Sequence, residues 1–357
     1  MAGHGGEGEG GERINAGGAP GSIELGVWPT FVANPQQSRD VQAVLASVSA
    51  LSIGATTLPL AEPWNELSGA TGSPRAVTWT RLDAMTQPFR DRGDNVALCI
   101  GLVDREVATA PLAGNWDSPE VSAALERTID EAYARYAASL SHLCFGYELD
   151  RYLAVAAKAD QTRLLALLKH AVDYASHHPL RNVAKTAIGN AITLSALAAA
   201  GAAPLEALML GDEVVAVYDP LDEQLKLKAP ESIAPEVEAA LATLAAAPGP
   251  RLPLTLFEVG YPSKVAAGSS EDAQKSYYDA LFGLLDTRRE EGNSIAFVGI
   301  FGLGDRAAKD CQAEALNFGA NAAGEATRAL VRCSMGLRAE KDKPAQQLVT
   351  AALSRYR

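Results

Sequence analysis

Short apolar runs alternate eight times with longer segments of helical periodicity along this chain, beginning near Ile23. Each apolar run has the length of a buried strand, and the segments after most of the runs repeat apolar residues at helical spacing. The expected strands cover residues 23–28, 55–60, 96–103, 143–149, 185–193, 213–218, 254–258 and 295–303. Repeated strand–helix units build a parallel sheet. Eight of them predict an α/β fold, a single (β/α)8 TIM barrel.

An open, doubly wound sheet is the alternative fold for such a pattern. Neither a GxGxxG nor a GxxxxGK[ST] loop follows any of the expected strands, so the usual signature of a nucleotide site is missing and we expect no cofactor. Residues 1–21 are rich in glycine and polar, which predicts a disordered tail. Residues 22–357 show no internal linker and are expected to form one domain.

Charge and cysteine content narrow the partners and the compartment. The formal net charge is −12 with a pI near 5.0, and no basic run offsets it, so nucleic acid and anionic membranes are disfavoured partners. A monomer or weak homo-oligomer is expected. The N-terminus lacks the apolar stretch of a secretory signal, which favours the cytoplasm unless a signal peptide was removed. Four cysteines occur without a CxxC pair, and Cys99 and Cys144 lie in apolar runs, which indicates buried free thiols.

Metal chemistry has little support in this sequence. No HxH or HExxH motif is present, and the five histidines fall away from the expected strand ends, so they are expected to be structural or exposed. The run Asp104–Arg105–Glu106 is typical of a solvated loop. We therefore expect no metal site.

Two of the expected strands end in a glutamate and then give way to a turn. Glu148 closes the run LCFGYEL, and Glu258 closes the apolar part of LTLFEVGYPS, 258 − 148 = 110 residues later. No hairpin or single helix brings together residues so far apart. The C-terminal ends of barrel strands meet at one face, where active sites lie. Glu148 and Glu258 are therefore a candidate catalytic pair.

The segment Glu258-Val-Gly-Tyr-Pro-Ser263 resembles the nucleophile motif of the large retaining clan of (β/α)8 glycoside hydrolases, which contains β-galactanases, β-glucanases and xylanases. The resemblance spans about residues 22–357 and implies that a small-molecule or oligosaccharide substrate is cleaved at a β-glycosidic bond. It also implies that Glu148 is the acid/base and Glu258 the nucleophile. A retaining mechanism requires their carboxyls to lie about 5–5.5 Å apart.

The same resemblance suggests which side chains contact the substrate. Tyr218 would hydrogen-bond the nucleophile, and Trp28 and Trp64 would stack on sugar faces. The full set of expected substrate-binding residues is Trp28, Trp64, Tyr147, Tyr218, Tyr261 and Phe301.

The chain departs from the pattern of this clan at three positions. Tyr147 stands where an asparagine that binds a sugar 2-hydroxyl is expected, and it should narrow the sugar subsite. The second strand lacks the arginine commonly found near the nucleophile, and Phe301-Gly302 replaces a tryptophan. Two alternatives to glycoside hydrolysis therefore remain open: carboxylate acid–base chemistry on a non-sugar small molecule, and a carbohydrate-binding scaffold without turnover.

Overall fold

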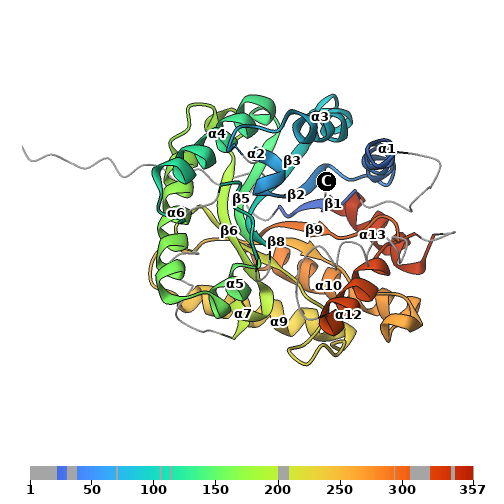
Figure 1. Cartoon of the computed structure of the whole chain (residues 1–357). Coiled ribbons are helices and arrows are strands. Elements are labelled where there is room, and N and C mark those ends of the chain that lie inside the picture. The colour runs from blue at the N-terminus through green and yellow to red at the C-terminus, as the bar shows by residue number, and fades with distance from the viewer. Residues whose placement is uncertain are drawn as a thin grey trace, which may run out of the picture.

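Eight parallel strands close into a barrel that is surrounded by helices (Figure 1). The computed structural model describes residues 22–29, 38–69, 71–104, 107–112, 115–199, 209–292, 294–305, 322–338 and 342–356. The strands follow the order β2-β1-β9-β8-β7-β6-β5-β3, and the pairing of β2 with β3 closes the ring. They are β1 (Glu24–Val27), β2 (Thr57–Pro63), β3 (Asn95–Asp104), β5 (Leu140–Tyr147), β6 (Ala187–Thr193), β7 (Glu213–Val217), β8 (Leu254–Val259) and β9 (Ile295–Ile300). The expected TIM barrel is thereby confirmed.

The helices pack outside the strands, and polar residues mark where several of them begin. Serine side chains accept the hydrogen bonds that cap α1, α4 and α10, from Ser38, Ser118 and Ser270. The described α-helices are α1 (Arg39–Ser52), α2 (Trp64–Ser68), α3 (Ala76–Arg90), α4 (Pro119–Tyr136), α5 (Leu149–Val155), α6 (Lys158–Ser176), α7 (Leu194–Ala198), α9 (Ile233–Ala246), α10 (Glu271–Glu290), α12 (Ala322–Cys333) and α13 (Pro344–Arg355). A two-residue strand, β4 (Val107–Ala108), pairs antiparallel with β3.

The apolar residues form two cores. The larger core lies between the strands and the helices, while a second cluster is formed by residues that include Trp28, Phe257, Phe297 and Phe301 from the strands and their ends. Alternating residues of a barrel strand point inward and outward, so both faces of each strand are buried. Val331 and Met335, from α12 and the turn after it, pack against this second cluster. The C-terminal part of the chain therefore covers the strand ends.

A buried ionic cluster joins the strands at their N-terminal ends. His142 on β5 lies 2.9 Å from Glu213 Oε2 through Nδ1 and 3.3 Å from Glu24 Oε2 through Nε2. Burial lowers the pKa of His142, but the charges and hydrogen bonds of Glu213 and Glu24 outweigh it and raise the pKa to about 10. His142 is thus a structural histidine, as the sequence indicated.

The cysteine prediction was wrong. Cys99 on β3 and Cys144 on β5 are register partners with Cα atoms 4.4 Å apart, and they form a disulfide. Cys333, at the end of α12, is disulfide-bonded as well. Whether two cysteines face each other depends on the register of their strands, and this register cannot be predicted from a sequence separation of 45 residues.

Two segments with sequence predictions lie partly or wholly outside the described residues: the tail 1–21 and the loop at 104–106. The tail and domain boundaries thus stay predictions. Across the described ranges, no helix is both long and apolar enough to cross a membrane.

Candidate active site

Glu148 sits at the point where β5 turns into α5. Its backbone is left-handed, with φ of 54°, a conformation that non-glycine residues rarely adopt. Gly146 makes the turn possible, because its φ is +71° and a Cβ there would lie 2.5 Å from the Leu149 side chain. Unfavourable backbone conformations of this kind concentrate at functional sites.

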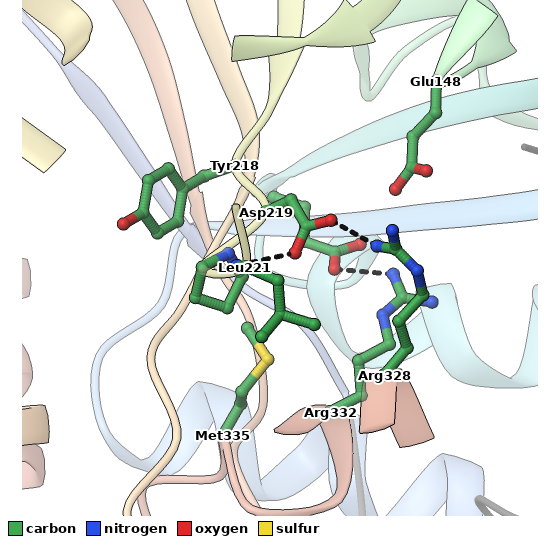
Figure 2. Close-up of a pocket in the computed structure, with 9 residues that line it drawn as sticks. Glu148, Tyr218, Asp219, Leu221, Arg328, Arg332 and Met335 are labelled. Carbon is green, nitrogen blue, oxygen red and sulfur yellow. Dashed lines mark hydrogen bonds and ion pairs between the residues drawn. The ribbon is translucent and has the colours of Figure 1, made fainter. Parts of the chain in front are cut away.

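Glu258 reaches the same place from β8. Both carboxylates line one cavity at the C-terminal mouth of the barrel, and the two residues are only 5% and 3% exposed (Figure 2). The structure therefore brings together the two glutamates that the sequence paired. Their expected carboxyl separation of about 5–5.5 Å stays a prediction.

Two groups bind the Glu258 carboxylate. The Tyr147 hydroxyl donates a hydrogen bond to Oε2, and Arg332 Nη2 on α12 lies 2.7 Å from Oε1. Burial, followed by the charge of Glu258, raises the pKa of Tyr147 well above its usual value, so the hydroxyl keeps the proton that it donates. These two contacts hold the Glu258 carboxylate in one orientation at the mouth.

Glu148 belongs to a second ionic group, which is linked through Arg151. Arg151 Nε lies 2.8 Å from Glu148 Oε2, and its Nη2 also binds Asp219 Oδ2. Arg328 Nη1 on α12 reaches the same Asp219 oxygen at 2.5 Å. Burial raises the pKa of Asp219, but Arg151 and Arg328 more than offset it, so the pKa is lowered and the carboxyl is ionised.

Helix α12 covers the mouth and leaves little space there. Arg328, Arg332 and the nearby Met335 form one wall of the cavity (Figure 2). The cavity has a volume of about 20 Å³, enough for one or two waters, and it is partly open to solvent. A pyranose ring with its hydroxyls is several times larger than water, so it would extend out of this space.

The motif residues after Glu258 hold the turn that follows α12. Ser263 Oγ donates to the Ser334 carbonyl at 2.9 Å, and the Lys343 ammonium lies 2.7 Å from Ser263 Oγ and 2.6 Å from the Gly336 carbonyl. The Gln274 amide nitrogen lies 2.8 to 3.2 Å from the carbonyls of Tyr261, Met335 and Gly336. These contacts tie α12 to the end of β8 and so position Arg332 over Glu258.

The expected sugar-stacking tryptophans lie in apolar cores. Trp64 is fully buried and donates through Nε1 to Thr128 Oγ1, so the expectation that it stacks on a sugar is wrong for this structure. Trp28 donates to the Phe257 carbonyl and contacts the Phe301 ring, whose own face lies 5.4 Å from the Arg332 guanidinium carbon. Phe301 thus lies at the mouth, beneath Arg332.

The tyrosines also differ from expectation. The Tyr218 ring points away from the acids and arginines, and its hydroxyl has no hydrogen-bond partner among the described residues, so the expectation that Tyr218 binds the nucleophile is wrong (Figure 2). Tyr147 binds Glu258 instead. Tyr261 stacks on Tyr277 and donates to the Lys228 carbonyl, a structural role.

Sequence reasoning missed the arginines and Asp219. The signals were weak: Arg151 follows Glu148 by three residues, Arg328 and Arg332 are one helical turn apart, and Asp219 directly follows the expected strand 213–218. The second strand provides no arginine, and Arg332 on α12 lies beside Glu258. Within the ranges that the structure describes, no group of histidine, cysteine and acidic residues could hold a metal ion.

No protein-family model matches this sequence, and no curated protein matches it. Solved structures share its fold. An alanine variant of a GH5_18 protein from Bifidobacterium longum subsp. longum, in complex with Manβ1-4GlcNAc, is 14% identical with a TM-score of 0.66, over 94% of this chain and 78% of that chain. A GH5_18 variant from Streptomyces cattleya, with the same ligand, is 17% identical with a TM-score of 0.63, over 94% and 81%.

The exo-β-1,4-mannosidase Op5Man5 from Opitutaceae bacterium strain TAV5 is 15% identical with a TM-score of 0.64, over 94% of this chain and 60% of that chain. The expected resemblance to (β/α)8 glycoside hydrolases is therefore confirmed at the level of the fold.

Proposed function

We propose that this chain, which has the fold of the (β/α)8 glycoside hydrolases, cleaves β-glycosidic bonds with retention of configuration. The observation that carries the proposal is the pairing of two buried carboxyls at one barrel mouth, where one of them, Glu258, has a cation and a hydroxyl donor of its own. Structural neighbours that bind Manβ1-4GlcNAc support a sugar substrate.

In the proposed reaction, a Glu258 oxygen forms a bond to the anomeric carbon while the bond to the leaving oxygen breaks. The leaving oxygen takes its electron pair and the proton of Glu148. Glu148 then removes a proton from water, which attacks the anomeric carbon and releases Glu258. Tyr147 and Arg332 hold the Glu258 carboxylate in place.

The test is kinetic and chemical. We expect Glu258→Ala to lower kcat on 4-nitrophenyl β-glycosides, including β-mannosides, by several orders of magnitude, because no other group replaces a missing nucleophile. Glu148→Ala should also lower kcat, because no base then activates the water that hydrolyses the glycosyl-enzyme. Azide should rescue both variants and give opposite anomers: the β-glycosyl azide with Glu148→Ala and the α-glycosyl azide with Glu258→Ala. Nuclear magnetic resonance distinguishes the two products.

The control variant is Glu62→Gln. Glu62 also lies near the end of a barrel strand, β2, but it pairs with Arg81 at 2.8 Å and does not line the cavity. It should leave kcat within about twofold of wild type. Equal activity of Glu258→Ala and wild type would contradict the assignment of the nucleophile.

A second candidate function is carbohydrate binding without turnover. It is favoured by the ion pairing of all three acids that line the cavity. Binding of oligosaccharide by a wild-type protein that hydrolyses none of a broad panel of β-glycosides would establish it over the hydrolase.

A further inference from the structure

Two arginines at the barrel mouth share one carboxylate oxygen. Arg151 and Arg328 both bind Asp219 Oδ2, while Asp219 Oδ1 accepts a hydrogen bond from the Leu221 amide at 3.0 Å. These three side chains are 21%, 17% and 12% exposed, so water screens their charges only partly. Two guanidiniums and one carboxylate carry one surplus positive charge, and Glu148 balances it through its ion pair with Arg151.

In the proposed reaction, Glu148 no longer neutralises this surplus positive charge once the substrate is bound. A general acid must hold its proton until the leaving oxygen takes it, so Glu148 is neutral in the reactive complex. Among the described residues, Arg151 and Arg328 then have only Asp219 as an ion-pair partner, and Asp150 acts on Arg151 more weakly than Asp219 does. A partly buried charge without a counter-charge is costly, and the cheapest remedy is a negative charge supplied by the ligand.

Arg328 is well suited to receive that charge. A guanidinium has five N–H donors in a planar fork that matches carboxylate, sulfate and phosphate groups. Among the described residues, the contact with Asp219 is its one hydrogen bond, and it is made through Nη1. Arg332, in contrast, is bound to Glu258 and Tyr147. The anion site is therefore expected at the Arg328 side of the mouth.

We infer that the sugar ligand of this mouth carries one anionic group, a carboxylate or a sulfate or phosphate ester, that binds Arg328 and Arg151. This inference rests on the proposed function, because it is the protonated Glu148 that leaves the surplus positive charge. Binding of the anion also replaces Glu148 as the partner of Arg151, so that ligand binding and proton retention at Glu148 support each other.

The test compares matched 4-nitrophenyl β-glycosides in the gluco, galacto and manno configurations. Each neutral glycoside is set against its uronide, its 6-sulfate and its 6-phosphate, which identifies the anionic group. We expect kcat/KM for one anionic series to exceed that of the neutral series by about tenfold or more, the equivalent of ~1.4 kcal/mol. Arg328→Gln should remove this preference, mainly through KM, and Arg328→Lys should restore part of it.

Arg75→Gln is the matched control, because it removes the same charge from an exposed pair with Glu66. It should leave the preference unchanged. A neutral series cleaved as well as every anionic one would overturn the inference, and so would an Arg328→Gln variant that loses activity on both series equally. Thermal unfolding of each variant identifies any loss caused by misfolding.

A binding measurement separates this inference from the proposed function. Calorimetric titration with D-glucuronate, D-glucose and glucose 6-phosphate requires no turnover. Anion-selective, salt-sensitive binding that Arg328→Gln abolishes, in a protein that hydrolyses nothing, would support the anion site and contradict the hydrolase. Hydrolysis of neutral glycosides without anion binding would support the hydrolase and contradict the anion site.

Discussion

At the residue scale, two tyrosines near the mouth have opposite environments. The Tyr147 hydroxyl binds the Glu258 carboxylate, whereas the Tyr218 hydroxyl has no hydrogen-bond partner in the described part of the chain. Lys228 Nζ lies 5.1 Å from the centre of the Tyr218 ring, which also packs against Tyr277. Tyr218 therefore stabilises the wall of the site, and Tyr147 acts on Glu258, the proposed nucleophile.

Removing each hydroxyl should separate these roles. A hydrogen bond to a charged group contributes about 1.5–3 kcal/mol, so Tyr147→Phe should lower kcat/KM by roughly 10- to 150-fold. Tyr218→Phe, the matched control, should leave kcat/KM within about threefold and the melting temperature unchanged or higher, because it deletes an unpaired buried hydroxyl. Steady-state kinetics and thermal unfolding measure both. Equal losses in the two variants would contradict the role of Tyr147.

At the scale of elements, α12 is the helix that covers the mouth of the barrel. Its arginines bind the acids of the mouth, and its C-terminal turn is held by Gln274, Ser263 and Lys343. The Glu-x-Gly-Tyr-Pro-Ser motif thus has two functions here. It carries Glu258, and it supplies the anchor for the helix that covers Glu258.

Breaking the anchor should loosen α12. Gln274→Leu removes amide contacts to three buried carbonyls, and we expect faster hydrogen exchange in peptides covering 326–338 and a loss of about 1–3 kcal/mol in the free energy of unfolding. Gln161→Leu is the control, since Gln161 Nε2 also donates to two carbonyls, of Leu153 and Ala156. It should speed exchange only near those residues. Unchanged exchange in 326–338 of Gln274→Leu would refute this anchoring.

At the scale of the whole molecule, charged groups join strands from different parts of the barrel. His142 on β5 bridges Glu24 on β1 and Glu213 on β7, all at the end of the barrel opposite the candidate site. The cluster links β1, β5 and β7 at this end of the barrel, and it makes stability depend on pH.

The sign of that dependence follows from the pKa values. The folded pKa of His142 is about 10, above its ordinary value of 6.5, so the stabilisation is fully present below pH 6.5 and is lost as the pH rises toward 10. The free energy of unfolding should fall across this window by up to ~1.4 kcal/mol per pH unit. Denaturant titrations of wild type and His142→Gln at pH 6.5, 8 and 9.5 measure it. A variant with the same slope as wild type would exclude His142 as the cause.

The Cys99–Cys144 disulfide links two neighbouring strands of the barrel, β3 and β5. Replacing Cys99 and Cys144 together by serine should lower the free energy of unfolding by about 2–4 kcal/mol, because the bond restricts the unfolded chain across 45 residues. Mass spectrometry of alkylated, unfolded protein checks the bond itself. Both cysteines should resist alkylation until a reductant is added, and labelling without reductant would contradict the disulfide.

Much of the fold and half of the candidate site could be predicted from the sequence alone. All eight strands were expected near their observed positions, because strand-length apolar runs and helical periodicity are local patterns. Glu148 and Glu258 were paired because the C-terminal ends of parallel strands must meet. These inferences need only the order of elements along the chain and the topology that the order permits.

The tertiary structure alone decided what surrounds the two glutamates. Arg332 is 74 residues from Glu258 in the chain, and Arg328 is 109 residues from its partner Asp219. No local pattern links the members of either pair. The orientation of Tyr147 and Tyr218, the burial of Trp64 and the facing of Cys99 and Cys144 depend on register and packing. Such contacts are set by the docking of whole elements, which a periodicity within one segment does not encode.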